Sequence, residues 1–360
     1  MFKKTTGFVM GIILGASLTF ASSALAAGFK NLSFTGEYMP KHPTVVKVWQ
    51  PFFKAAEEKF PGKQGLSFDY FSNGGLFPEA EGFAALTDGR ADFAVIRPNV
   101  FPGKMNLIDA PAIPGMCPNA IVGSLVTEEL IENFPEIRAE LPPNSVPFTG
   151  WASASFQVHT IKPIKTVEEL KGKKLIAWGS VAMDMVKALG ANPIRLPSPD
   201  TYLALSKGMA DGVLCPIAPL RSLKISDSAK YHMVLDLGVS TFAMNVHKPL
   251  WDSMPEEIRA WLNGEGHMKM ALAIGKSLYD GELDDIKWMK QQDHEFIYFS
   301  QEEREKALKH MEIFLDDWKK RCADAGYDAA LINKVLDFTR ERSKYHAAQM
   351  QAGAYGNYGK

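Results

Sequence analysis

One short sequence pattern occurs twice in the chain, at a separation typical of a whole domain. Residues 83–92 read Phe-Ala-Ala-Leu-Thr-Asp-Gly-Arg-Ala-Asp, and residues 202–211 read Tyr-Leu-Ala-Leu-Ser-Lys-Gly-Met-Ala-Asp. Each copy predicts a helix that ends at its glycine, because glycine adopts a positive φ without steric cost. An apolar strand is predicted directly after each copy, over 93–96 and over 213–214. The repeated unit therefore predicts two similar lobes within one chain.

The segments around both copies alternate between helical and strand-like apolar spacing. The expected elements are a helix over 45–60, a strand over 66–71 and a helix from Pro78 in the first half, and a strand over 174–178, a helix over 181–189 and a strand over 193–196 in the second. Such alternation is typical of mostly parallel sheets, whose strand ends meet at a crevice where α/β proteins bind ligands. We therefore expect an α/β fold of two lobes with a ligand cleft between them.

Beyond Pro255 the chain consists mainly of long charged helical segments. They cover 256–290, 301–325 and 329–351, with a strand-like segment over 295–299. These helices are expected to pack across both lobes, and the Gly/Tyr-rich tail is expected to fray. The expected organisation is a signal peptide over 1–26, lobe I over 27–150 and 238–275, lobe II over 151–237, and C-terminal helices over 276–360 with the frayed tail at 352–360.

The N-terminal segment has the composition of an export signal. Lys3 and Lys4 precede an uncharged apolar run over 7–20, and Ala24-Leu25-Ala26 supplies the small residues that signal peptidase requires. The run is shorter than the roughly 20 residues that a permanent membrane anchor needs. We therefore expect a periplasmic protein that is exported and cleaved near Ala26.

Composition and motifs argue against several classes of function. The 40 Lys and Arg residues nearly balance the 41 Asp and Glu residues, so no net charge attracts nucleic acid. Cys117, Cys215 and Cys322 form no Cys-x-x-Cys motif and no zinc-binding spacing. Neither a metal nor a cofactor is expected. The three cysteines are expected to be buried thiols, and pairing of any two of them stays open.

A periplasmic enzyme is the competing class of protein, but the usual catalytic motifs are missing from the sequence. It contains no Gly-x-Ser-x-Gly, Ser-x-x-Lys, His-Glu-x-x-His or Gly-x-Gly-x-x-Gly. Gly275-Lys-Ser resembles the end of a phosphate-binding loop, but Met270 stands where that loop needs its first glycine. We therefore expect binding without catalysis.

A set of motifs, in its order and spacing, resembles the DctP-type substrate-binding proteins of TRAP transporters, the tripartite ATP-independent periplasmic uptake systems. The motifs are Phe-Ser-Asn-Gly-Gly-Leu at 71–76, Gly-Arg-Ala-Asp at 89–92, Glu-Glu-Leu-Lys-Gly-Lys-Lys at 168–174, Leu-Gly-Ala-Asn-Pro at 189–193, Gly-Met-Ala-Asp-Gly at 208–212, Met-Asn at 244–245 and Trp-Asp-Ser-Met-Pro at 251–255. The resemblance covers essentially the whole mature chain. It implies a periplasmic binding protein-like fold, a monomer whose lobes close over a small molecule, and a small and a large membrane subunit as partners.

One position departs from the family pattern. Most members hold a ligand carboxylate with an arginine in the strand that corresponds to 174–178, because a planar guanidinium matches a carboxylate. Ile176 occupies that position here, and two positions that are polar in sialic-acid-binding relatives align with Phe156 and Cys215. Because all three changes are toward apolar residues, we expect a small organic anion, carboxylate or sulfonate, with an apolar or aromatic body.

The remaining candidate contacts lie at predicted strand ends and in loops. Arg97 follows the strand over 93–96 and is the nearest candidate for an anion contact, with a surface or hinge salt bridge as the alternative. Trp151, Trp178 and Phe156 are assigned to strand ends of the second lobe, where they form either an aromatic wall or core. The polar candidates are His42 after the first strand, Asn73 in a glycine-bearing turn and Asn245, with capping, turn and hinge roles as their alternatives.

Two other functions of a binding protein are also compatible with the sequence. A sensor-coupled binding protein, or the binding protein of an ATP-driven importer, would have the same alternation of helices and strands. The sequence does not separate these outputs from TRAP uptake.

Overall fold

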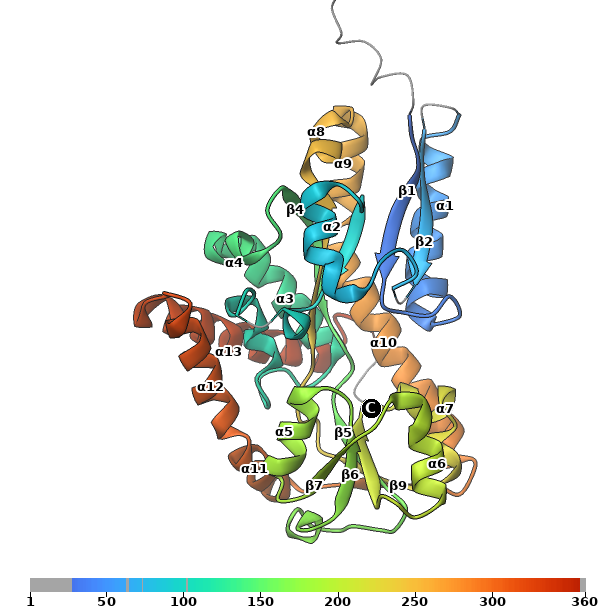
Figure 1. Cartoon of the computed structure of the whole chain (residues 1–360), viewed down its shortest axis with the longest axis vertical. Helices are drawn as coiled ribbons and strands as arrows, with labels where there is room; N and C mark the ends of the chain where they lie inside the picture. The colour runs from blue at the N-terminus through green and yellow to red at the C-terminus, as the bar shows by residue number, and fades with distance from the viewer. Residues whose placement is uncertain (1–27, 63–64, 73, 102, 357–360) are drawn as a thin grey trace, which may run out of the picture.

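The computed structural model describes residues 28–62, 65–72, 74–101 and 103–356, so the predicted signal peptide lies outside the described residues. These residues form two lobes, each built on a mixed sheet with helices against it (Figure 1). Within them no helix combines the length and apolar character needed to cross a membrane. The predicted α/β fold with two lobes and long C-terminal helices is confirmed.

The first lobe is built on a five-stranded sheet in the order β2-β1-β3-β10-β4. Its strands are β1 Phe29–Gly36, β2 Leu66–Ser72, β3 Phe93–Ile96, β4 Ser145–Ala152 and β10 Thr241–His247, and its helices include α1 Gln50–Lys59, α2 Gly82–Asp88, α3 Ala120–Asn133, α4 Pro135–Glu140, α8 Lys248–Ser253 and α9 Glu256–Glu265. Phe34 lies in an aromatic-rich core, with its ring centroid 4.9 Å from that of Trp49 and 5.6 Å from that of Phe93. These large rings bury the apolar face of β1.

The second lobe is built on a six-stranded sheet in the order β11-β9-β5-β8-β6-β7. Its strands are β5 Gln157–Thr160, β6 Lys174–Ala177, β7 Asn192–Arg195, β8 Gly212–Cys215, β9 Tyr231–Val234 and β11 Glu295–Tyr298, and its helices include α5 Ser180–Ala188, α6 Thr201–Ser206 and α7 Ala218–Ser222. The outer strand β11 comes from the C-terminal third of the chain and pairs in parallel with β9.

Both copies of the repeated sequence pattern form the same local structure. Helix α2 ends at Gly89, whose φ is +81°, and β3 follows directly. Helix α6 is followed by Gly208, whose φ is +68°, and then by β8. The helix–glycine–strand prediction is confirmed in both lobes, because only glycine takes this backbone conformation without strain.

The sheets are mixed rather than mostly parallel. Strand β10 runs antiparallel to both of its neighbours in the first sheet, and β5 does so in the second. Each of these strands enters its sheet directly from the other lobe instead of through a helical crossover. A strand that enters without a crossover is free to pair antiparallel.

Two chain segments connect the sheets and lie side by side. One segment links β4 to β5, and the other links β9 to β10. The amide of Ser153 donates to the carbonyl of Ser240 at 2.8 Å, and the amide of Phe156 donates to the carbonyl of Gly238 at 2.9 Å. The connection is therefore a hydrogen-bonded pair of segments.

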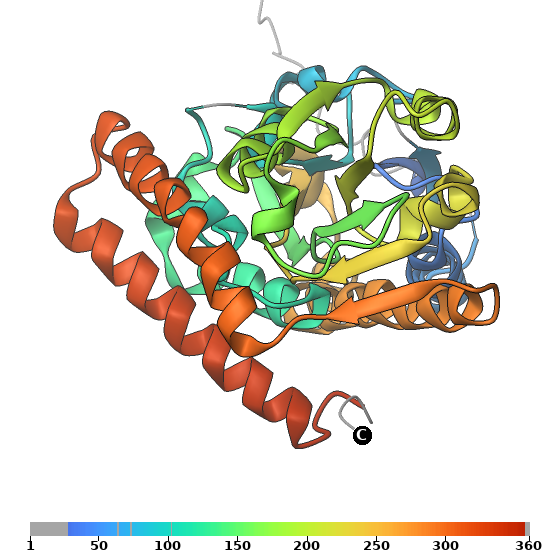
Figure 2. The ribbon, with the colours of Figure 1, turned by 90° about the horizontal axis from the view of Figure 1, so that it is seen from below.

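Helix α10, His267–Lys290, is a third connection between the lobes (Figure 2, orange). Met270 and Ile274 are buried in the aromatic-rich core of the first lobe, and Met289 is buried in a core cluster of the second. A Cβ atom on Gly275 would lie 2.9 Å from the carbonyl oxygen of Ala120. This glycine therefore allows α10 to approach α3, and it is not part of a phosphate-binding loop.

The last three helices also contact both lobes. They are α11 Gln301–His310, α12 Glu312–Asp324 and α13 Ala329–Gln351. Ala307 of α11 is buried in a core cluster of the second lobe, whereas Trp318 and Val335 are buried in the first. In the tail, which was expected to fray, the Tyr355 hydroxyl lies 2.6 Å from Nδ1 of His346, so the described residues 352–356 are held against α13.

Candidate functional site

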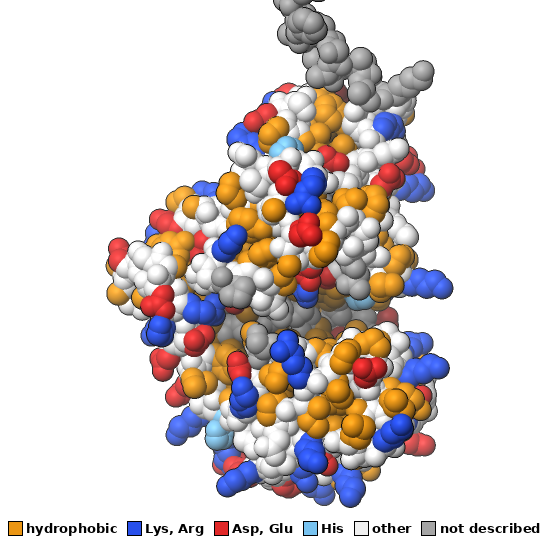
Figure 3. All heavy atoms as spheres, in the orientation of Figure 1, with side chains coloured by type: hydrophobic (Ala, Val, Ile, Leu, Met, Phe, Trp, Pro, Cys, Tyr) orange, Lys and Arg blue, Asp and Glu red, His pale blue; other side chains and the backbone are white. Residues whose placement is uncertain are grey.

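The parallel strands β1, β2 and β3 end at the edge of the first lobe that faces the second lobe (Figure 1). The loops after these strands enclose a cavity of about 300 Å³. It is lined by Thr35, Gly36, Glu37, Gly74, Gly75, Leu76, Phe77, Pro78, Glu79 and Val95. The molecular surface is hollowed between the two lobes (Figure 3). This edge is where a ligand is expected in an α/β protein.

Glu37 directly follows β1 and contributes a carboxylate to this cavity. Both carboxylate oxygens are buried, and neither makes a hydrogen bond to any described residue. Burial raises the pKa of Glu37 to about 7. Its own backbone amide and the Tyr38 hydroxyl lower this pKa by smaller amounts, but neither reaches the carboxylate in hydrogen-bond geometry. Sequence reasoning missed Glu37, but its signal was available, because it follows a strand end as Arg97 does.

An aromatic group adjoins Glu37. The rings of Tyr38 and His42 are stacked with centroids 4.1 Å apart. The Tyr70 hydroxyl donates to the Tyr38 carbonyl at 2.7 Å, and Nε1 of Trp151 donates to the Tyr38 hydroxyl at 3.3 Å. Burial lowers the pKa of His42 to about 4, so its imidazole is neutral at pH 7. His42 therefore offers a ring and a hydrogen bond at this edge, but no positive charge.

Arg97 follows β3 at the same edge and is already paired. Its Nε and Nη2 atoms donate to the two carboxylate oxygens of Glu79. The side chains of Arg97 and Glu79 are 30% and 35% exposed. The guanidinium carbon also lies 5.9 Å from the centroid of the Phe242 ring. A ligand anion would therefore have to compete with Glu79 for this arginine.

The predicted apolar positions of the second lobe lie mostly in its core. Ile176 and Cys215 are fully buried in one apolar cluster, and Trp178 packs against it. Nε1 of Trp178 donates to Oγ1 of Thr201 at 3.1 Å. Burial raises the pKa of the Cys215 thiol, which therefore stays protonated. The structure thus brings together three of the predicted apolar positions.

A chain of three buried histidines lies behind Cys215. Nε2 of His159 is 3.1 Å from the Cys215 carbonyl, and its Nδ1 is 2.9 Å from Nδ1 of His232. Nε2 of His232 is 2.8 Å from Nδ1 of His294, whose Nε2 is 3.1 Å from Nζ of Lys230. The carbonyl at one end of this chain only accepts, and the ammonium at the other end only donates. Each of the three rings must therefore donate from one nitrogen and accept at the other, so each is neutral and in a single tautomer. Burial lowers the pKa values of His159, His232 and His294 to about 3, 2 and 4.

Trp151 lies in the first lobe and not in the second, where the sequence placed it. Strand β4 continues through Trp151, which pairs with Phe242 of β10. Its ring is fully buried and stacks on that of Phe242, with centroids 5.3 Å apart. Phe156 lies in the connection and packs against the second-lobe core. Trp151, Phe156 and Trp178 therefore occupy three different parts of the molecule.

The two predicted asparagine contacts are placed as follows. Asn73 lies outside the described residues. Asn245 is fully buried in β10, opposite Ala94 and Pro147. Its amide atoms make no hydrogen bond to a described residue. It lies within the sheet and does not line the cavity at the ends of β1, β2 and β3.

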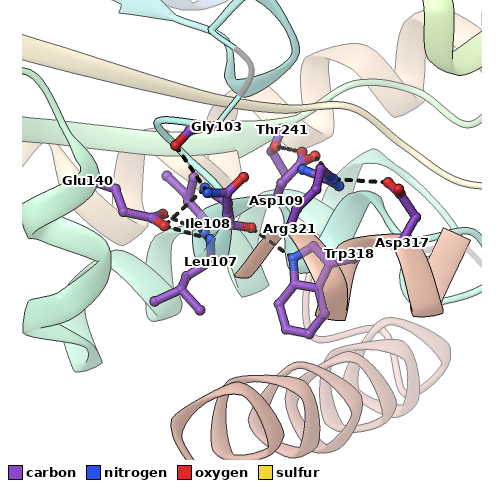
Figure 4. A network of polar contacts seen from close by, with 10 residues as sticks. Gly103, Leu107, Ile108, Asp109, Glu140, Thr241, Asp317, Trp318 and Arg321 are labelled. Atoms are coloured by element: carbon purple, nitrogen blue, oxygen red, sulfur yellow. Dashed lines mark hydrogen bonds and ion pairs between the residues drawn. The ribbon is translucent and has the colours of Figure 1, made fainter. Parts of the chain in front are cut away.

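A second cavity, of about 230 Å³, lies where α5, α12 and the first lobe meet, and is lined by both lobes. Its polar side chains are largely engaged with one another (Figure 4). Oγ1 of Thr241 donates to Asp109 at 2.7 Å, and Nε of Arg321 donates to Asp317 at 3.0 Å. Arg321 also lies 3.8 Å from Asp109, and burial raises the pKa of Asp109 to about 6. These pairs connect α12 to β10.

The same network anchors the helical turn Leu107–Ala112 (Figure 4). The Glu140 carboxylate accepts from the amides of Leu107 at 2.9 Å and Ile108 at 3.1 Å. Nε1 of Trp318 donates to the carbonyl of Asn106 at 2.7 Å. These hydrogen bonds hold the turn to α4 and α12, whereas Oδ1 of Asn106 is buried without a partner among the described residues.

One group of side chains in the described residues has donor atoms close enough for a metal ion. Atoms of Glu128, Glu132 and His267 lie within 4.8 Å of one another. Glu128 already accepts from the amide of Gly150 and from Nδ1 of His267 at 3.0 Å. Glu128 and His267 therefore already have partners within the protein. All three cysteines are buried free thiols, which answers the question of pairing.

The sequence and the fold match one family of known proteins. Residues 35–321 match the family "Bacterial extracellular solute-binding protein, family 7". A solute-binding protein of Albidiferax ferrireducens is 24% identical over 235 residues, which are 62% of this chain and 67% of that protein.

Two solved structures share the fold. A TRAP periplasmic solute-binding protein of Desulfovibrio salexigens, solved as an open complex, has a TM-score of 0.80 at 21% identity, over 88% of this chain and 96% of that one. A TRAP solute-binding protein of Rhodoferax ferrireducens, solved with copurified benzoate, has a TM-score of 0.75 at 19% identity, over 88% and 98%. The chain therefore belongs to family 7 of the bacterial extracellular solute-binding proteins, the DctP-type periplasmic binding proteins of TRAP transporters, which bind a solute without catalysis.

Proposed function

We propose that this protein captures a small organic acid with an apolar or aromatic body and delivers it to a TRAP transporter. In this proposal the lobes close over the ligand, and the closed form, acting as a monomer, meets a small and a large membrane subunit. The relative from Rhodoferax ferrireducens was solved with benzoate, an acid of this class.

The observation that carries the proposal is Trp178, a half-buried ring that directly follows β6 in the second lobe and is backed by an apolar cluster, which together are called the apolar wall. Ile176 and Cys215 are fully buried together, with Trp178 against them. An apolar wall gains free energy by covering apolar ligand surface, at about 25 cal/mol per Å² removed from water. A ligand that is polar over its whole surface, such as a sugar acid, would lose hydrogen bonds to water against this wall without replacement.

The acid group of the ligand is assigned to Arg97. Arg97 directly follows β3, whose end lies beside the cavity lined by Val95 and Glu79. A guanidinium binds a carboxylate through two parallel hydrogen bonds. The present partner of Arg97, Glu79, is partly exposed, and exposed ion pairs contribute only about 0–1 kcal/mol. A ligand carboxylate excluded from water by lobe closure would interact more strongly.

Isothermal titration of the mature protein with benzoate and with succinate tests this proposal. Benzoate is expected to bind more tightly than succinate, and Arg97→Ala is expected to weaken benzoate binding at least tenfold. The matched control is Arg90→Ala, because Arg90 also pairs with carboxylates, Glu81 and Asp88, on the exposed surface. Tighter binding of succinate, or equal affinity of the two variants, would overturn the assignment of the wall or of Arg97.

Delivery to membrane subunits is tested separately. Genes adjacent to this one are expected to encode a small and a large membrane subunit. An adjacent ATPase gene would instead favour an ATP-driven importer, and an adjacent receptor gene a sensor.

A further inference from the structure

The Glu37 carboxylate is an unusual group to find at a binding cavity. Its two oxygens are buried and make no hydrogen bond to any described residue. Buried polar groups are almost always hydrogen-bonded, and an unpaired one destabilises the protein by about 1–3 kcal/mol, or more when it is charged. Glu37 is a lining residue of the cavity at the ends of β1, β2 and β3. An unpaired acceptor in this position is available to a ligand.

The neighbouring charges do not supply a partner for Glu37. Arg97 donates to both carboxylate oxygens of Glu79. The two side chains together form a neutral ion pair. The imidazole of His42 is neutral at pH 7, because burial lowers its pKa to about 4. Tyr70 donates its hydroxyl to the Tyr38 carbonyl and is therefore also engaged. The Tyr38 hydroxyl, which accepts from Nε1 of Trp151, is the nearest side-chain donor, but it does not reach Glu37 in hydrogen-bond geometry. The cavity as a whole presents an unmatched hydrogen-bond acceptor with partial negative charge.

An acceptor of this kind discriminates strongly between ligands. A second carboxylate facing Glu37 would be repelled, and an apolar group would leave the carboxylate unpaired. A hydroxyl or an ammonium would instead form a charge-assisted hydrogen bond, which is roughly twice as strong as a neutral one. Sites built around a polar group reject ligands that lack the complementary group more sharply than apolar pockets reject a missing methylene.

We infer that the ligand presents an O–H or N–H donor to Glu37, in addition to the acid group assigned to Arg97. This inference rests on the proposed function and narrows it from organic acids in general to hydroxy or amino acids with an apolar or aromatic body. Glu37 is then the residue that selects among acids of similar size.

Matched ligands provide the test. Affinities are measured by isothermal titration at pH 7.5 for benzoate, the three hydroxybenzoates and the three aminomethylbenzoates. At least one donor-bearing isomer is expected to bind ten times more tightly than benzoate. Glu37→Leu, which removes both acceptor oxygens, is expected to abolish this preference while benzoate still binds. Glu37→Gln retains one acceptor oxygen and is expected to lose mainly the preference for ammonium.

A control variant separates this effect from a general loss of charge. Asp69→Asn removes an exposed carboxylate from β2 and should leave the preference for donor-bearing acids unchanged. Unfolding curves of all variants establish that each is folded before it is titrated. Equal affinity of benzoate and every donor-bearing isomer, or an undiminished preference in Glu37→Leu, would overturn the inference.

The failure of this inference and the failure of the proposed function have different signatures. Benzyl alcohol and benzylamine carry the donor without the acid. If they bind through Glu37 while no acid binds, the acid requirement is wrong and the role of Glu37 stands. If benzoate binds through Arg97 but Glu37→Leu changes nothing, the proposed function stands and the role of Glu37 is wrong. Binding of none of these compounds would overturn both.

Discussion

The two lobes face each other with opposite chemistry. At its edge the first lobe gathers Glu37, His42, Glu79 and Arg97, so its loops carry charge and hydrogen-bonding capacity. The second lobe presents a buried apolar cluster around Ile176. In the proposed function, the first lobe would recognise the polar groups of the ligand and the second would cover its apolar surface. Most of the family, by resemblance, places an arginine in the second lobe instead.

The division has a physical advantage for a protein that closes. Polar contacts made by one lobe can form while the cleft is still open, and the apolar wall then excludes water from them. Exclusion of water strengthens the hydrogen bonds already made. Three substitutions test this difference between the lobes.

Restoring the family arginine in the second lobe is expected to have the largest effect. Ile176 is fully buried among apolar side chains, so Ile176→Arg places an unpaired charge in that cluster. We expect it to lower the free energy of unfolding by about 4 kcal/mol, measured by urea denaturation. The matched control, Ile176→Val, should lower it by only about 1 kcal/mol. A stable Ile176→Arg protein that binds benzoate more tightly would show that this wall is open to the cleft.

Acid is expected to act on the second lobe through the histidine chain. The pKa of His294 falls from 6.5 to about 4 on folding, so below pH 6.5 the unfolded state binds more protons than the folded state. Stability is therefore present above pH 6.5 and is lost as the pH falls toward 4. Burial raises the pKa of Glu37 to about 7, so protonation below pH 7 favours the folded state of the first lobe.

The substitution His294→Gln isolates one member of this chain. A glutamine amide can donate to His232 and accept from Lys230, but it does not titrate. Between pH 7 and pH 5 the wild type is expected to lose about 1 to 2 kcal/mol more of its free energy of unfolding than His294→Gln. His310→Gln, which removes an exposed histidine, should behave as wild type. Identical pH profiles of wild type and His294→Gln would contradict the neutral chain.

The smallest expected effect concerns the ion pair of the first lobe. Glu79→Gln removes the carboxylate that occupies Arg97, so the arginine becomes available to a ligand acid. We expect benzoate to bind about threefold more tightly, which corresponds to about 0.7 kcal/mol, measured by titration. The control Glu81→Gln removes a neighbouring exposed carboxylate that pairs with Arg90. Unchanged affinity in Glu79→Gln would mean that the acid group of the ligand does not meet Arg97.

The sequence predicted the architecture better than it predicted the contacts. The helix–glycine–strand pattern depends on local backbone preferences, so α2 with β3 and α6 with β8 were recovered. The sequence did not predict that β5 and β10 run antiparallel to their neighbours, because the direction of each strand depends on how the chain crosses between the lobes. The same limit explains Trp151, whose strand extends only because β10 pairs with it.

Three of the predicted apolar positions lie together where neighbouring strand ends determine their placement. Ile176, Cys215 and Trp178 come together because β6 and β8 are neighbours in one sheet. The pairing of Arg97 with Glu79 depends on side-chain conformations across a loop, which residue spacing does not encode. Glu37 was missed because an unpaired carboxylate becomes conspicuous only when its burial and its missing partners are both known.

The paired segments between the lobes also bear on how the molecule moves. Hydrogen bonds from Ser153 to Ser240 and from Phe156 to Gly238 make them a narrow ribbon. A ribbon flexes across its flat face but resists shear in its own plane, so in the proposed closure it would bend about one axis, together with the α10 connection. Opening and closing along a single arc would return the first-lobe loops to the same place on the apolar wall in every cycle. The connecting segments, and not the ligand, would then determine how the first-lobe loops align with the second lobe.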